Sequence, residues 1–202
     1  MAKRQANGGE RARQVLAQEA ARIIVEQGIE DYRVAKLKAA ERLGMSERGS
    51  LPGNAEIEKA LSEHLLLFGR ESYVDLLRSL RHAALSAMEM LAPFTPRLVG
   101  PVLHGTASAN SAVNLHVFAD SAEMVAMRLQ ENRVQYRPFE RRLKSRRDRV
   151  ETFAAFRFTQ DESDIETTVF PVDGVRQAPI SPVDGKPMQR ADRNTILKLL
   201  ED

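Results

Sequence analysis

Apolar residues in the first half of the chain recur every three to four positions, which is the spacing of one face of an α-helix. Asp31 and Asn54 are typical N-cap residues, and Gly28 and Gly44 are typical residues at a helix end. The pattern predicts helices over residues 10–27, 32–43 and 71–91, and one after Asn54 that carries Ile57, Leu61, Leu65 and Phe68.

In the second half, the apolar period changes to that of β-strands, in which successive side chains point to opposite faces. Val113, Leu115 and Val117 alternate with Asn114 and His116, for example, so the first three are expected to enter the core. The pattern predicts a strand over residues 98–104, a turn over 105–111, strands over 112–118, 134–138, 152–159 and 164–172, a short helix after Ser121, a proline-rich loop over 172–187 and a last helix over 193–200.

These elements predict an α+β fold, with a small mixed sheet, flanking helices and a helical N-terminal region. The expected organisation is a flexible N-terminus over residues 1–9, a helical region over 10–92 and an α+β domain over 93–202.

The strand pair and its turn carry a recognisable pattern. Gly105-Thr106 and Ser111-Ala112-Val113-Asn114-Leu115 resemble the Gly-[Ser/Thr], short loop and Ser-Asp-x-Asp-Leu signature of the nucleotidyltransferase superfamily that contains DNA polymerase beta. Three further phrases are similar to a group of poorly characterised bacterial nucleotidyltransferase-like proteins, namely residues 118–121, 168–171 and 181–187. The resemblance covers roughly residues 76–170 and implies a nucleotidyltransferase-like sheet.

In active members of this superfamily, two strand aspartates and a third carboxylate hold two divalent ions about 3.5–4 Å apart. Here the aspartate positions are Ala112 and Asn114, and Glu166 falls where the third carboxylate belongs. The resemblance therefore implies a degenerate site, with Glu166 and Asn114 as weak metal ligands and His116 as a possible third catalytic group. An ordinary polar residue in a cleft is the alternative interpretation of His116.

The same resemblance makes the turn a candidate phosphate site, because a glycine lets the backbone approach a phosphate and the N–H and hydroxyl groups donate to it. The candidate phosphate or nucleotide contacts are Gly105, Thr106 and Ser111. Lys186, in the tail turn between Gly185 and Pro187, is a fourth candidate, and an exposed turn lysine is the alternative.

A basic segment follows the strand at residue 134. Between Arg137 and Arg149 lie seven basic residues and two acidic ones, with Phe139 as the interrupting aromatic. Arginine suits bidentate phosphate recognition. This segment is a candidate nucleic-acid patch, against a solvent-exposed hairpin or a patch that faces the acidic run at residues 161–166; its residues are Arg141, Arg142, Lys144, Arg146, Arg147 and Arg149.

The composition excludes several classes of protein and of binding site. The net charge is +2 at a pI of about 9.0, and the chain has no cysteine, which excludes disulfides and thiolate metal sites. No apolar run has the length of a membrane span, and no P-loop, zinc spacing, nucleophile elbow or dinucleotide fingerprint occurs. These features predict a cytoplasmic protein with no membrane partner.

Three functions therefore remain open. The first is a nucleotidyltransferase-like pseudoenzyme that binds a nucleotide or a phosphorylated partner. The second is an active metal-dependent transferase that moves a nucleoside monophosphate from an NTP to a hydroxyl. The third is a nucleic-acid-binding module. The cofactor is accordingly either Mg²⁺ with an NTP or none, and the sequence leaves enzyme activity and oligomeric state open.

Overall fold

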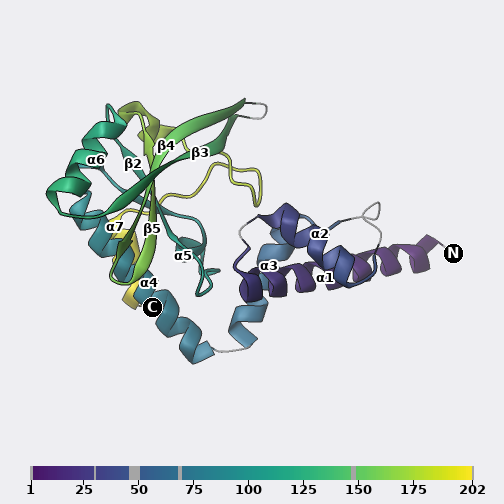
Figure 1. The fold of residues 1–202 in the computed structure, drawn as a ribbon. Coiled ribbons are helices and arrows are strands. Elements are labelled where there is room, and N and C mark those ends of the chain that lie inside the picture. The colour runs from purple at the N-terminus through teal and green to yellow at the C-terminus, as the bar shows by residue number, and fades with distance from the viewer. Residues whose placement is uncertain (1, 30, 46–50, 68–69, 147–148, 202) are drawn as a thin grey trace. The chain divides into compact units, whose positions relative to one another are not determined.

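The computed structural model of the protein describes residues 2–29, 31–45, 51–67, 70–146 and 149–201. The chain divides into two compact units (Figure 1). The helical unit comprises Met1–Tyr73 with Ser108–Asn110 and Pro182–Asp184, and the α+β unit comprises Val74–Ala107, Ser111–Ser181 and Gly185–Asp202. The division falls inside helix α4 (Arg70–Met90), whereas the sequence places it after residue 92.

Three helices build the helical unit: α1 (Ala2–Gln27), α2 (Tyr32–Arg42) and α3 (Asn54–Leu67). Helix α1 begins at Ala2, ahead of the expected start at residue 10. Asp31 caps α2 as predicted, and its Oδ1 accepts from the Arg33 N–H at 2.7 Å. Gly53, rather than Asn54, precedes α3, and its N–H donates to the Glu56 side chain at 2.7 Å. The expected helix position Phe68 lies outside the described residues.

The described residues of the α+β unit form a five-stranded mixed sheet with the order β1-β2-β5-β4-β3, which confirms the predicted α+β class. Strands β2 and β5 are parallel, and the other neighbours are antiparallel. The strands are β1 (Arg97–Val99), β2 (Val113–Phe118), β3 (Tyr136–Arg146), β4 (Arg149–Gln160) and β5 (Ser163–Phe170).

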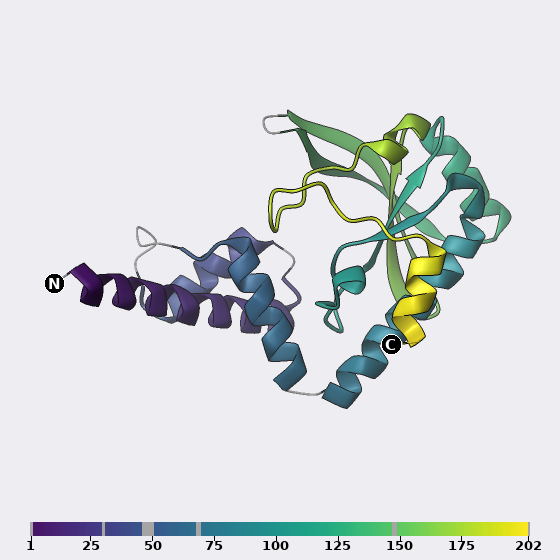
Figure 2. The same cartoon turned by 180° about the vertical axis from the view of Figure 1, so that it is seen from behind.

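One face of this sheet packs against helices α4, α6 (Ala122–Glu131) and α7 (Arg193–Glu201), as Figures 1 and 2 show. Val113, Leu115 and Val117 enter this core, as their alternation predicts, and each is fully buried. The apolar core also includes Leu80, Ala84, Leu91, Leu98, Val125, Leu129, Phe156, Phe158, Ile165 and Ile196. The opposite face of the sheet carries polar side chains and the rings of Phe118, Phe153 and Phe170, and the tail lies against part of it.

The segment after β1 differs from the expected strand. Residues Pro101–His104 form a short helix, α5, because a proline cannot donate to a strand ladder and fits the first turn of a helix. Gly100, just before it, has φ +74°, a conformation that glycine adopts without a steric penalty. His104 therefore lies in a helix and not at the end of a strand.

The tail connects the two edges of the sheet. After a 3₁₀ turn (Val172–Arg176), the Ile180 N–H donates to the Lys144 carbonyl of edge strand β3 at 2.6 Å. Ala191 then pairs with Leu98 of edge strand β1. The prolines and Asp-Gly pairs of the tail predict a loop, and the tail is one. These contacts fix it at both edges of the sheet. A second 3₁₀ turn, Ala92–Phe94, links α4 to β1.

Candidate functional site

The register of the sheet brings residues from four strands into one row. Asn114 of β2 pairs with Glu166 of β5, Glu166 pairs with Arg157 of β4, and Arg157 pairs with Arg137 of β3. Side chains that are opposite one another in a ladder share a face. The row therefore lies on the face away from the apolar core, where the resemblance expects a metal site.

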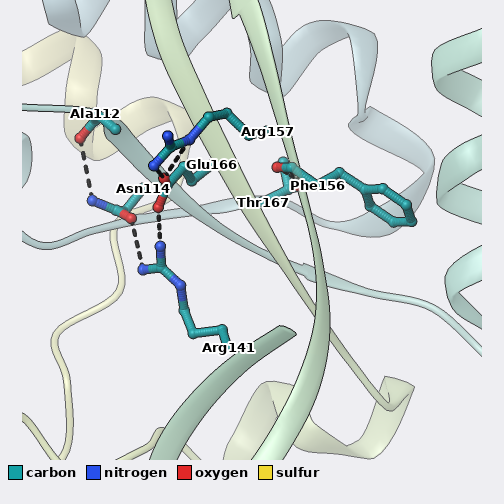
Figure 3. Close-up of polar contacts among 7 residues, drawn as sticks. All are labelled: Ala112, Asn114, Arg141, Phe156, Arg157, Glu166 and Thr167. Carbon is teal, nitrogen blue, oxygen red and sulfur yellow. Dashed lines mark hydrogen bonds and ion pairs between the residues drawn. The ribbon is translucent and has the colours of Figure 1, made fainter. Parts of the chain in front are cut away.

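Glu166 is the centre of this row, and its side chain is 2% exposed. Its Oε1 accepts from Arg157 Nε at 2.7 Å and also from Arg157 Nη2, while its Oε2 accepts from Arg141 Nη2 (Figure 3). Arg141 Nη1 donates to Asn114 Oδ1 at 2.9 Å, and Asn114 Nδ2 donates to the Ala112 carbonyl at 3.2 Å. We call Asn114, Arg141, Arg157 and Glu166 the arginine–glutamate cluster.

Arg141 reaches the cluster from β3 and has to cross β4 to do so. Between them, β4 presents Ala155, which is 1% exposed and pairs with Thr168 of β5 and Phe139 of β3. Because alanine is small, it leaves room for the arginine side chain above it. The Arg141 guanidinium also lies 5.4 Å from the centre of the Phe139 ring, within the range of a cation–π interaction.

The cluster offers little to a divalent ion. Ala112 supplies no side-chain ligand, and both oxygens of Glu166 accept from guanidinium groups. Asp164 is exposed and lies opposite Thr159. Among the described residues, no three His, Cys, Asp or Glu side chains gather as they would around a metal. A magnesium ion would have to displace two cations here, so the donor set does not fit it.

The turn before β2 is also internally bonded. Gly105 adopts φ +72° at the end of α5, and both its N–H and that of Thr106 donate to the Pro101 carbonyl, the latter at 3.0 Å. Thr106 is buried and Ser111 is half-buried. The backbone groups that the resemblance assigns to a phosphate thus have a partner within the loop, and their phosphate role stays a prediction.

His116 lies on the same face, buried against the tail. Arg190 Nε donates to His116 Nδ1 at 3.1 Å, and Arg190 Nη1 donates to the carbonyls of Gly174 at 2.9 Å and Val175 at 3.2 Å. Burial, together with the positive charges of Arg190 and Arg141, lowers the pKa of His116 to about 3. His116 is therefore neutral and accepts a hydrogen bond, so it helps to fix the tail.

Arg190 completes this tail contact with its flat guanidinium face. It lies 4.9 Å from the ring centre of Phe118 and 5.0 Å from that of Phe170. Burial, and the charge of Arg97, lower the pKa of Arg190 to about 10. Sequence reasoning missed Arg190, because no periodicity places a residue of a proline-rich tail.

Arg157 was missed as well, although it lies in a predicted strand. Its alternation with apolar residues was visible, but its partner depends on the register between β4 and β5, which local sequence does not reveal. An ion pair joins the basic segment to the acidic run at residues 161–166: Arg141 binds Glu166.

The rest of the candidate nucleic-acid patch lies apart from the cluster. Arg142 and Lys144 are exposed, and Arg149 has a 70% exposed side chain that pairs with Glu151 at 2.8 Å. Arg146 is described through its backbone, as the last residue of β3, and Arg147 lies outside the described residues. Lys186 is exposed in the tail turn.

Comparisons with known proteins add no identification. No protein-family model matches the chain, and comparisons with curated proteins and with solved structures find no match. Across the described residues, every helix is too short or too polar to span a bilayer.

Proposed function

We propose that the protein binds a nucleotide or another phosphorylated ligand at the arginine–glutamate cluster, without a divalent metal and without transferring the nucleotide. One observation carries this proposal. Two guanidinium groups hold the carboxylate at the position that the resemblance assigns to the third metal ligand. Arginine side chains thus provide positive charge on this face. In a nucleotidyltransferase, bound metal ions provide the positive charge at this place.

Arg157 has hydrogen-bond donors to spare for a ligand. Its side chain is 55% exposed, and its bonds to Glu166 use Nε and Nη2. Nη1 donates to no described residue, so its two N–H groups are available for a phosphate oxygen. The planar guanidinium of arginine matches two oxygens of a phosphate at once, which a lysine ammonium does not.

The charge balance of the row also favours an anion. Arg141, Arg157 and Glu166 together keep one net positive charge, and the exposed Arg137 lies directly opposite Arg157. Like charges that face each other across strands are destabilising. A phosphate that bridges Arg137 and Arg157 would relieve this repulsion, which supports the open side of Arg157 as the binding point.

The lack of strand aspartates supports binding in place of transfer. Nucleotidyl transfer needs metal ions to orient the triphosphate and to stabilise the attacking and leaving oxygens. Ala112 contributes no ligand, and the amide oxygen of Asn114 accepts from Arg141. We therefore expect this site to recognise phosphate groups without transferring them.

Calorimetric titration tests the proposal directly. Purified protein is titrated with a nucleoside monophosphate and with an NTP, each in EDTA and in Mg²⁺. We expect binding in EDTA that Arg157→Gln weakens at least about tenfold, since it removes a charge-assisted contact. Arg33→Gln in the helical unit is the charge-matched control and should leave affinity unchanged. Binding that requires Mg²⁺ would overturn the proposal in favour of the active transferase.

Glu166→Gln gives a second test, because only the metal-dependent function predicts a loss of binding. If Glu166 clamps two arginines, the substitution raises the local positive charge, and phosphate affinity in EDTA should rise or stay the same. If Glu166 is a metal ligand, the same substitution removes the carboxylate that holds the ion, and metal-dependent NTP binding should fall.

A further inference from the structure

The hairpin of β3 and β4 concentrates basic residues. Between Tyr136 and Gln160 the sequence holds eight basic and three acidic residues, against a net charge of +2 for the whole chain. In Figures 1 and 2 the far ends of β3 and β4 project beyond the helices of their unit. Positive charge is therefore concentrated on one protruding element.

The pleat of β3 separates two groups of basic residues. Arg137 and Arg141 share the face of the arginine–glutamate cluster, and Arg141 is bonded within it. Arg142 and Lys144 alternate with them and point to the opposite face. Their ladder partners are Thr152 and Val150 of β4. The second group is thus free of the cluster and faces away from its ligand.

These side chains are open to solvent and bonded to little. Arg142 and Lys144 are exposed, and neither side chain has a hydrogen bond or ion pair with a described residue. Arg149, with its side chain 70% exposed and paired with Glu151, lies near the end of the hairpin on the other face, because its neighbour Val150 is the ladder partner of Lys144. The backbone beneath them is fixed, because the Lys144 carbonyl accepts from Ile180 of the tail at 2.6 Å.

We propose that the end of this hairpin, with Arg142 and Lys144 on one face and Arg149 on the other, binds the phosphate backbone of double-stranded DNA. Arg142 and Lys144 lie about 6.8 Å apart along the strand, which is twice the axial rise of about 3.4 Å per phosphate of one DNA strand. A polyanion can contact all of these charges at once, whereas a single phosphate contacts one or two of them.

Two features of the hairpin favour double-stranded DNA as the ligand: the burial of its aromatic residues and its shape as a two-stranded ribbon. Single-stranded nucleic acid is held by bases that stack on exposed aromatic rings. In the described part of the hairpin, every aromatic residue is half-buried or buried. A two-stranded β-ribbon fits the major groove of B-form DNA, whereas the deep, narrow major groove of A-form RNA does not admit it.

The same charges argue against pairing of β3 with a second copy of the chain. An edge strand that carries several positive side chains repels a copy of itself, and such charges are a common protection against edge-to-edge association. The basic edge is thus unsuited to self-association and suited to a polyanion.

The test is fluorescence anisotropy of a labelled duplex DNA titrated with the full chain in EDTA, between about 50 and 200 mM salt. Three phosphate contacts predict a slope of log affinity against log salt of about −2.7. Arg142→Gln/Lys144→Gln should weaken binding at least about tenfold at the lowest salt and make the slope shallower by about 1.8.

The matched control is Arg33→Gln/Lys59→Gln, which removes two exposed charges from the helical unit. It should leave both affinity and slope unchanged. Equal losses in the two double variants, or a slope near zero for the unmodified protein, would overturn the proposal. Tighter binding of single-stranded DNA or of duplex RNA than of duplex DNA would overturn the choice of ligand.

This inference stands apart from phosphate binding at the cluster, and two measurements keep them distinct. Arg142→Gln/Lys144→Gln should retain the nucleotide affinity of the unmodified protein, because both residues face away from Glu166. Conversely, Arg157→Gln should retain DNA binding. A thermal melt of each variant establishes that it is folded, so a loss of binding reflects the removed charge.

Discussion

The exposure of each partner decides what the ion pairs of the cluster contribute to stability. Glu166 is buried, whereas the side chains of Arg141 and Arg157 are 26% and 55% exposed. An arginine that loses Glu166 can therefore turn to water, whereas the buried carboxylate cannot when it loses an arginine. Glu166 is thus the member that depends on its partners.

We expect Glu166→Ala to lower the free energy of unfolding by about 1–3 kcal/mol, the range for lost hydrogen bonds to charged groups. Arg157→Ala should cost at least as much, because it leaves the buried Oε1 of Glu166 without its hydrogen-bond donors. Urea denaturation of the two variants measures the difference. A clearly smaller loss for Arg157→Ala than for Glu166→Ala would contradict this account.

His116 links protonation to folding. Its folded-state pKa of about 3 lies below the usual value near 6.5. Between these values the unfolded chain binds a proton that the folded chain does not, so acid favours unfolding. The stability associated with neutral His116 is present above pH 6.5 and is lost as the pH falls towards 3, with a limiting slope of about 1.4 kcal/mol per pH unit.

His116→Gln should therefore flatten the fall in stability between about pH 6 and pH 4, because glutamine can still accept from Arg190 but does not titrate there. Thermal melts across this pH range compare the variant with the unmodified protein. His82→Gln, on the exposed side of α4, is the control. An unchanged pH dependence in His116→Gln would show that His116 does not couple protonation to folding.

Among the elements, β4 sets the position of the site, because its residues separate β3 from β5. Phe153, Ala155 and Arg157 share the face of the cluster. Arg157 belongs to the cluster, Phe153 packs on Phe170 with ring centres 4.5 Å apart, and Ala155 leaves the path of Arg141 open. A larger residue at position 155 would close that path.

Ala155→Leu should displace Arg141 from Glu166, weaken phosphate binding in EDTA and cost about 1–3 kcal/mol of stability through overpacking. The measurements are the calorimetric titration and a denaturation curve. Ala154→Leu is the matched control, since the neighbouring Ala154 is exposed and points to the other face. An unchanged phosphate affinity in Ala155→Leu would show that the Arg141 side chain does not need to cross β4 above Ala155.

Most strands of the sheet could be predicted from the sequence, whereas one short helix and the partners of Glu166 could not. Alternation at residues 112–118, 152–159 and 164–172 predicted β2, β4 and β5, because each of these strands has a clear apolar side. The helix at Pro101–His104 was missed, because an apolar run so short has no period and Pro101 decides its form. Glu166 was identified as a site candidate, but its partners Arg141 and Arg157 follow from strand register, a long-range property.

Among the described residues, each of the two units buries an apolar set of its own. The core of the α+β unit draws on residues between Leu80 and Ile196. The helical unit buries its own set, in which Ile23, Ile57 and Ala39 are almost fully inaccessible. We therefore expect a cavity made in one of these sets to act first on the unit that holds it.

Ile57→Ala should destabilise the helical unit by about 2–5 kcal/mol, the usual cost of truncating a large buried side chain to alanine. Hydrogen exchange should accelerate in α1, α2 and α3 and stay unchanged in the five strands. Leu115→Ala is the reciprocal variant and should accelerate exchange in the strands. Equal acceleration throughout the chain in both variants would indicate a single cooperative unit.

The bond from Arg141 to Asn114 has a consequence for how this sequence could evolve. An aspartate that arises by mutation at position 114 would pair with Arg141 before it met a metal ion. Conversely, loss of Arg141 and Arg157 would leave Glu166 buried without a counter-charge. A route to a metal site that removes these arginines thus passes through less stable intermediates.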